Sequence, residues 1–237
     1  MRKLIAFGIA AGLATAWAFS GYIYRYRLTL FVEADGLIYE GSSVIQIEVH
    51  RGITINGGGT ITTSKIMGEA IAVDLGTRGV LFALLSRDSG ESADTIAYRI
   101  FPITGASAGS AAIEFYPTLR ASAEVPKNYL PMLVHFRNIK DPKTIEKVDV
   151  NNVAQTFGGE TRLVRSTIEM VSPGIWPFNK IGITGIPVTT GIENRFPPWF
   201  AEIRQKGASL DGDTGLLRHI VAPLSNKLSI SDFSRRY

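Results

Sequence analysis

The sequence contains no cysteine and only three histidines. Without cysteine the protein cannot form disulfide bonds, use a thiolate nucleophile, or bind zinc or an iron–sulfur cluster through thiolates. The histidines, His50, His135 and His219, lie far apart in the sequence and belong to no paired metal-ligand motif. The sequence therefore predicts neither a metal site nor a cofactor.

Charged residues are also sparse, at 19% of the chain, and they leave a net charge of only +4. The basic residues are scattered and do not form a stripe with interleaved aromatic residues, which argues against nucleic acid as a partner. A mildly basic surface is compatible with a position near anionic lipid. Hydrophobic residues make up 45% of the chain, which is enough to bury an ordinary core.

The N-terminal segment has the features of a membrane anchor. An apolar run over residues 4–23 follows Arg2 and Lys3 and contains no charged residue. At 1.5 Å per residue this run would form roughly 30 Å of helix, enough to cross the hydrocarbon core of a bilayer. Trp17, Tyr22 and Tyr24 gather at its C-terminal end, where aromatic rings favour the headgroup level. We expect a single transmembrane helix that contacts lipid through residues 4–23.

A cleaved signal peptide is the alternative, because an A-x-A pattern stands at residues 14–16. Cleavage there would leave an apolar new terminus, so the uncleaved anchor is favoured. Both alternatives export the following domain to the periplasm, with the uncleaved form held in the bacterial inner membrane. Arg2 and Lys3 are nearly balanced by Arg25 and Arg27 across the run, which leaves a cytoplasmic domain open.

Gly8 and Gly12 form a G-x-x-x-G pattern within the apolar run. This spacing lets two membrane helices approach closely and predicts self-association. The alternative is that small residues are simply common in leader segments.

The remainder of the chain has the patterning of a mainly β protein. Apolar residues alternate over residues 24–33 and 43–50, and Asp35-Gly36 between them is a turn signal, so the two segments predict a hairpin. The expected fold is a set of antiparallel hairpins in a sandwich-like or barrel-like domain with a few short helices. Further strands are expected at residues 69–75, 80–85, 95–101, 132–136 and 162–171, and short helices or turns at residues 143–148 and 149–157.

Residues 105–112 are almost all glycine, alanine and serine, which are too small to fill a core. We interpret this tract as a linker or loop. It divides the chain into an N-terminal membrane anchor or signal segment at 1–24, a hairpin-rich part at 25–104, the linker at 105–124, and a second β-rich part with short helices at 125–237.

Four segments resemble an uncharacterised proteobacterial family of membrane-anchored proteins. They are YRLTL at residues 26–30, GSSVI at 41–45, GEAIAVDLG at 68–76 and DPKT at 141–144. The resemblance spans most of the chain after the anchor. It implies a protein of the bacterial envelope and carries no known activity.

One motif predicts an enzyme. Residues 105–109 match the G-x-S-x-G nucleophile motif of serine hydrolases, with Ser107 as the nucleophile and Asp211 and His219 as the acid and base in the required order. That motif needs a parallel strand followed by a helix, whereas Pro117 follows closely and the neighbouring segments look like hairpins. An exported serine hydrolase is therefore the alternative function.

Aromatic residues beside prolines mark two further segments. One carries Ile175, Trp176 and Phe178, and the other carries Trp199 and Phe200. If exposed, these side chains would contact a partner or lipid; if buried, they would close the end of the core. The sequence as a whole predicts a non-enzymatic, membrane-anchored envelope protein that binds an unidentified partner or serves as an accessory subunit of a membrane complex.

Overall fold

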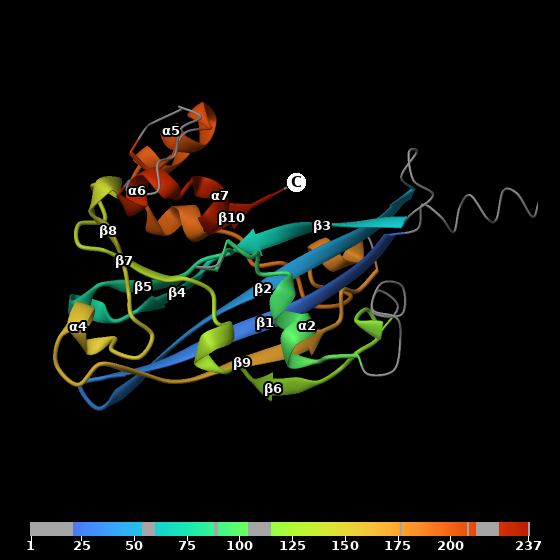
Figure 1. Cartoon of the computed structure of the whole chain (residues 1–237), viewed down its shortest axis with the longest axis horizontal. Coiled ribbons are helices and arrows are strands. Elements are labelled where there is room, and N and C mark those ends of the chain that lie inside the picture. The colour runs from blue at the N-terminus through green and yellow to red at the C-terminus, as the bar shows by residue number, and fades with distance from the viewer. Residues whose placement is uncertain are drawn as a thin grey trace, which may run out of the picture.

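The computed structural model confirms a β-rich fold, with two antiparallel sheets and a few short helices (Figure 1). It describes residues 21–53, 60–87, 90–103, 115–175, 177–207, 209–211 and 223–236. Gly8, Gly12, Ser107, Trp176 and His219 lie outside these ranges.

A long hairpin forms the centre of the larger sheet. Strands β1 (Gly21–Ala34) and β2 (Leu37–Ile53) pair without interruption from Gly21 opposite His50 to Ala34 opposite Leu37. The two turn residues, Asp35 and Gly36, both have positive φ, at 53° and 74°. Such turns match the right-handed twist of the strands they join. The predicted hairpin is confirmed and is longer than the alternating segments indicated.

The larger sheet has six strands in the order β10-β3-β2-β1-β9-β6. The hairpin strands are at its centre, and strands from the rest of the chain add on each side. These are β3 (Thr60–Glu69), β6 (Ser122–Glu124), β9 (Arg162–Val171) and β10 (Ser234–Arg235). Strand β9 has the bounds that the sequence predicted.

The smaller sheet has four strands in the order β4-β5-β7-β8 and is covered on both faces. In β5, Leu81 and Ala83 face one apolar cluster, while Phe82 and the following Leu84 face another. A strand buried on both sides needs a continuous apolar run, which explains the sequence of residues 80–85. The strands are β4 (Ile71–Asp74), β5 (Val80–Ala83), β7 (Leu133–Phe136) and β8 (Ile145–Lys147).

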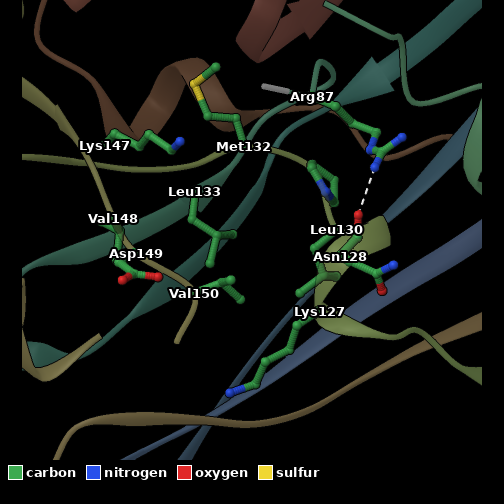
Figure 2. A pocket seen from close by; sticks show the side chains of 11 residues that line it. Arg87, Lys127, Asn128, Leu130, Met132, Leu133, Lys147, Val148, Asp149 and Val150 are labelled. Atoms are coloured by element: carbon green, nitrogen blue, oxygen red, sulfur yellow. Dashed lines mark hydrogen bonds between the residues drawn. The ribbon is translucent and has the colours of Figure 1, made fainter. Parts of the chain in front are cut away.

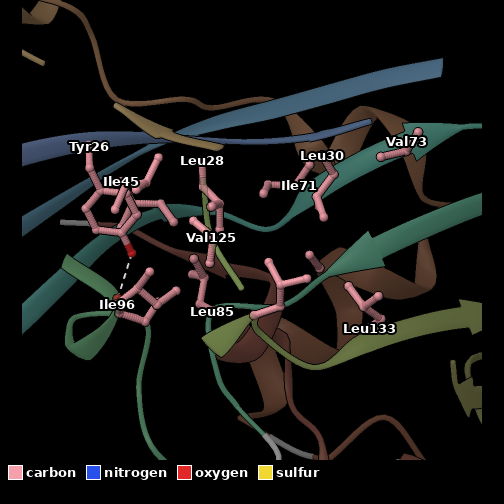
Figure 3. Close-up of a cluster of buried hydrophobic side chains, with 14 of the residues drawn as sticks. Tyr26, Leu28, Leu30, Ile45, Ile71, Val73, Leu85, Ile96, Val125 and Leu133 are labelled. Carbon is pink, nitrogen blue, oxygen red and sulfur yellow. Dashed lines mark hydrogen bonds between the residues drawn. The ribbon is translucent and has the colours of Figure 1, made fainter. Parts of the chain in front are cut away.

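The first apolar cluster fills the space between the two sheets (Figure 3). Every second residue of β1 points into this space, with Tyr26 towards Ile96 and Leu30 towards Ile71 of the smaller sheet. This is the side-chain alternation of a strand with one buried face.

The second cluster lies on the other face of the smaller sheet, beneath the C-terminal helices. Phe196 stacks on Phe200 with ring centroids 4.5 Å apart and on Phe82 at 5.1 Å. The chain thus forms three layers: the larger sheet, the smaller sheet and a helical layer. The helices of that layer are η5 (Ile192–Arg195), α5 (Trp199–Lys206), α6 (Leu224–Lys227) and α7 (Ile230–Phe233).

The strand predicted at residues 95–101 is wrong, because this segment forms helix α2 (Thr95–Ile100). Ile96 and Ala97 are fully buried, Ile100 packs against the same cluster, and Arg99 is exposed. Buried positions at i, i+1 and i+4 fit one face of a helix and do not fit the two-residue period of a strand.

The short helices predicted after residue 140 are partly confirmed. Asp141 accepts a hydrogen bond from the Lys143 amide at 3.0 Å and caps the turn η3 (Pro142–Thr144), but β8 follows directly in place of a longer helix. Helix α4 (Ala154–Phe157) begins later than the predicted start at residue 149, and Gly158 ends it with φ of 72°.

The end of the expected anchor differs from the prediction. Residues 21–23 pair with β2 and belong to β1, so the apolar run is not one helix as far as residue 23. Within the described part of the chain, no helix is long and apolar enough to span a membrane. Residues 1–20 lie outside the described residues. Strands from residues 25–104 and from residues 125–237 share both sheets.

Arg78 ties the tip of the hairpin to two other turns. It lies in η1 (Gly76–Arg78), between β4 and β5, and its guanidinium donates to both carboxylate oxygens of Asp35 at 2.9 and 2.7 Å. It also donates to the Phe157 carbonyl at 2.6 Å. These hydrogen bonds hold the pKa of Asp35 below its ordinary value.

Buried tyrosines make the first core sensitive to alkaline pH. Tyr26 donates to the Ala93 carbonyl at 2.7 Å and Tyr116 to the Phe101 carbonyl at 2.8 Å. Burial raises the pKa values of Tyr24 and Tyr26 far above the ordinary value of 10.0 and raises the pKa of Tyr116 to about 12. The folded chain therefore keeps these hydroxyls protonated where the unfolded chain would release the protons.

We predict that the free energy of unfolding falls as the pH rises above 10. The unfolded state then binds fewer protons than the folded state, and Tyr24 and Tyr26 should each contribute about 1.4 kcal/mol per pH unit. Urea unfolding between about pH 9 and pH 12 would measure this slope, and Tyr26→Phe should make it shallower. Phenolate absorbance from every tyrosine before any loss of structure would contradict the prediction.

Candidate functional site

Of the residues predicted for a serine hydrolase, the structure describes only one. Only Asp211 of the three lies within the described ranges, because Ser107 and His219 are outside them. One carboxylate oxygen of Asp211 accepts from the Ser209 hydroxyl at 2.6 Å and the other from the Asn226 amide at 2.9 Å. These bonds tie Asp211 to α6. The hydrolase thus stays a prediction.

No group of three or more histidine, aspartate or glutamate side chains suited to a metal occurs among the described residues. His135 lies on β7, and its contacts are those of a residue that packs within the fold. Its Nδ1 lies 3.1 Å from the Val80 carbonyl oxygen, and its ring packs against Phe157 with centroids 4.7 Å apart. A Cβ on Gly79 would come within 2.8 Å of this ring, so His135 fills the space that glycine leaves.

The two aromatic segments have different surroundings. Phe200 is 1% exposed and belongs to the second core, and the Trp199 indole donates to the Ile139 carbonyl at 2.9 Å. This segment therefore closes the core. Phe178, in contrast, is 51% exposed.

The segment around Phe178 is a closed loop that leaves the end of β9. It contains the short helix η4 (Phe178–Lys180), and the Ile186 amide donates back to the Ser172 carbonyl at 3.0 Å. Gly174 passes so close to Thr184 that an added Cβ would lie 2.0 Å from its carbonyl oxygen. The loop has a defined shape because only glycine allows this approach.

Four large apolar side chains of this loop face solvent: Ile175 at 69%, Phe178 at 51%, Ile181 at 72% and Ile183 at 67% exposure. We refer to these four residues as the apolar loop. Sequence reasoning singled out Ile175 and Phe178 but missed Ile181 and Ile183. The alternation of isoleucine with glycine and threonine at residues 181–186 was the available signal.

Arg25 holds the loop on the larger sheet. It is only 3% exposed, and it donates to the Ile186 carbonyl at 2.5 Å and to the Gln46 side chain at 2.7 Å. Nearby, the Thr189 amide donates to the Val44 carbonyl at 3.1 Å. Arg25, which the sequence assigned to the charge balance around the anchor, is therefore a buried support for the loop.

A second candidate surface is a groove of about 600 Å³ beside η2 (Lys127–Tyr129) (Figure 2). Arg87, Lys127 and Lys147 line it, and Asp149 is the one acidic residue among its lining residues. Its apolar wall consists of Leu130, Met132, Leu133, Val148 and Val150. Lys147 and Asp149 reach into the groove from the same side, while Arg87 donates to the Asn128 carbonyl at 2.7 Å.

A hollow of about 510 Å³ continues the groove and shares Lys127 and Val150 with it. Asn151, Asn152 and Arg162 line this continuation together with two acidic residues, Glu33 and Glu160, and Arg162 pairs with Glu33 at 2.6 Å. The hollow is therefore mixed in charge. The groove itself, with Lys127 and Lys147 beside an apolar wall, suits a partner that presents carboxylates or other anionic groups.

Glu69 fixes the C-terminal segment of the chain on the larger sheet. Its carboxylate is buried and accepts from the Ile192 amide at 2.6 Å, from Arg236 at 2.9 Å and from the Ser234 hydroxyl at 3.3 Å. Arg236 also pairs with Glu193 at 3.1 Å. Because the partners come from separate segments, this carboxylate joins β3, η5 and the C-terminal strand.

Comparisons with known proteins add no relative, since no family model, no curated protein and no solved structure matches the chain. The likeness to an envelope protein family therefore stays a resemblance of short segments. Inference about function depends on the geometry of the apolar loop and the groove.

We predict that Arg236→Met lowers the free energy of unfolding by about 1.5 kcal/mol, because it leaves a buried carboxylate without its cation; partial exposure of Arg236 limits the loss. Arg195→Met is the matched control, since Arg195 meets Asp74 only at 3.8 Å on the surface. Urea denaturation of both variants checks the difference. Equal losses would contradict the role given to Glu69.

Proposed function

We propose that this chain is a single-pass protein of the bacterial inner membrane whose β-rich domain lies in the periplasm and binds a partner without catalysing a reaction. The partner is a separate envelope protein or a membrane complex of which this chain is an accessory subunit. The observation that carries the proposal is the direct succession of the uncharged stretch at residues 4–20 and β1, which begins at Gly21.

The length of the uncharged stretch supports this anchor. As a helix, residues 4–20 would measure roughly 26 Å, which is at the short end of the range for membrane spans. Because β1 begins at Gly21, directly after the uncharged stretch, a helix over residues 4–20 would lead into a central strand of the larger sheet. The domain would therefore stand directly at the membrane surface.

The groove supports the binding role. Lys127 and Lys147 are exposed at its edge, and Asp149 is the one acidic side chain among its lining residues, while Arg87 is already paired with Glu91. A partner with acidic side chains would gain charge-assisted hydrogen bonds there and be steered to the groove. The exported serine hydrolase with Ser107 is the competing prediction, and no observation on the described residues favours it.

We predict that Lys127→Glu combined with Lys147→Glu releases the partner, because two charge reversals place like charges across the contact. Membranes carrying the full chain would be extracted in mild detergent and the assembly sized. Wild type should migrate as a complex larger than the purified chain, and the double variant should migrate as the chain alone.

Lys140→Glu is the matched control, since Lys140 is also exposed but does not line the groove. It should leave the complex intact. If the double variant still assembles, the groove is not the surface that contacts the partner. A wild-type chain that is extracted alone would count against partner binding itself.

A further inference from the structure

We propose that the apolar loop inserts into the headgroup layer of the bilayer that holds the N-terminal anchor, so that the domain contacts the membrane at two points. The inference rests on the proposed anchor and names a second, independent lipid contact. It concerns Ile175, Phe178, Ile181 and Ile183, each of which is at least about half exposed.

The strand directions place this loop near the start of β1. Strand β9 is antiparallel to β1, and its last residue, Val171, lies opposite Arg25. The chain that leaves β9 therefore heads towards Gly21, which is roughly 14 Å from Arg25 along the strand. In Figure 1 the orange segment after β9 lies towards the end of the hairpin where β1 begins, and the β1–β2 turn lies at the opposite end.

The loop is held in shape before any contact with lipid. The close approach of Gly174 and Thr184 shapes its base, and Arg25 fixes Ile186 to the sheet. In this conformation the four apolar side chains are exposed. A preformed loop loses little conformational entropy when its side chains insert.

The charge around the loop favours a lipid surface. Residues 170–192 contain no aspartate or glutamate, and Lys180 is the single charged residue among them. An ammonium group among apolar side chains suits anionic headgroups, whereas a carboxylate there would be repelled.

The size of the patch favours lipid over a protein partner. A stable protein interface commonly uses about 20 to 30 residues on each side, far more than these four. A few apolar side chains are enough to strengthen an attachment that a transmembrane segment already provides. Four such residues on one loop are also too many to be scattered surface exposures.

The absence of cysteine allows a direct test on the full chain. Three variants would each contain one cysteine: Ile181→Cys, Ile38→Cys and Leu13→Cys. Each cysteine would carry an environment-sensitive fluorophore, and each variant would be placed in nanodiscs of phosphatidylethanolamine and phosphatidylglycerol. Ile38 is the matched control, because it is 57% exposed at the far end of the hairpin. Quenching by spin-labelled lipid is compared with quenching by aqueous iodide.

We expect the label at Ile181 to shift its emission to the blue and to be quenched by spin-labelled lipid, as at Leu13, while the label at Ile38 is quenched by iodide. Ile183→Cys should behave like Ile181→Cys, which guards against a local effect of one label. If iodide quenches the labels at both loop positions as it quenches the label at Ile38, the loop contact is overturned, even if Leu13 lies in lipid.

Two further outcomes distinguish a failure of the loop contact from a failure of the proposed anchor. Protection of both loop labels from iodide and from spin-labelled lipid would indicate protein contact, such as a second copy, and would overturn the proposal. Iodide quenching at Leu13 would overturn the anchor itself. The two failures are therefore distinguishable within one set of variants.

Discussion

The two-residue turn at Asp35 and Gly36 sets the register on which the rest of the structure depends. With both residues in the left-handed region, the turn brings Ala34 opposite Leu37 and fixes every later pair of the hairpin. A slip by one residue would send the apolar side chains of one strand to the opposite face of the sheet. The space between the two sheets would then lose the apolar side chains that fill it. Strands β9 and β3 would also lose the edges with which they pair.

The two candidate surfaces depend on this frame through different supports. The apolar loop is fixed by Arg25, which is a residue of the hairpin itself, and by the end of β9. The groove depends on the smaller sheet, whose position follows from burial on both faces. Glu69 joins the larger sheet to the segment that follows the loop, because it binds both the Ile192 amide and the C-terminal residue Arg236.

The sequence predicts those parts of the fold in which local pattern and packing agree. The hairpin alternates clearly, so its faces could be assigned from the residues alone, whereas the buried positions of β9 change parity at the bulge between Leu163 and Arg165. Helix α2 could not, because the six residues of Thr95–Ile100 fit a short strand as well, and only contact of Ile96 and Ala97 with the core decides between them. Short apolar segments are ambiguous in this way.

The candidate site was less predictable than the fold. Arg87, Lys127 and Lys147 come from three separate segments, so nothing in their local sequence indicates a shared groove. Phe178 and Phe200 look alike in sequence, since both are aromatic residues near proline, yet Phe178 is exposed and Phe200 is buried. Tertiary packing decides this difference. The buried role of Arg25 is equally invisible, because it depends on the carbonyl of a residue far along the chain.

In the proposed arrangement, residues 4–20 hold this domain on the outer side of the inner membrane. Fusion of alkaline phosphatase after Tyr237 would report the location of the domain, because that enzyme needs disulfide bonds that form in the periplasm and not in the cytosol. We expect an active reporter that becomes inactive when residues 4–20 are deleted. An inactive reporter on the full chain, beside a cytosolic reporter that is active at the same position, would contradict it.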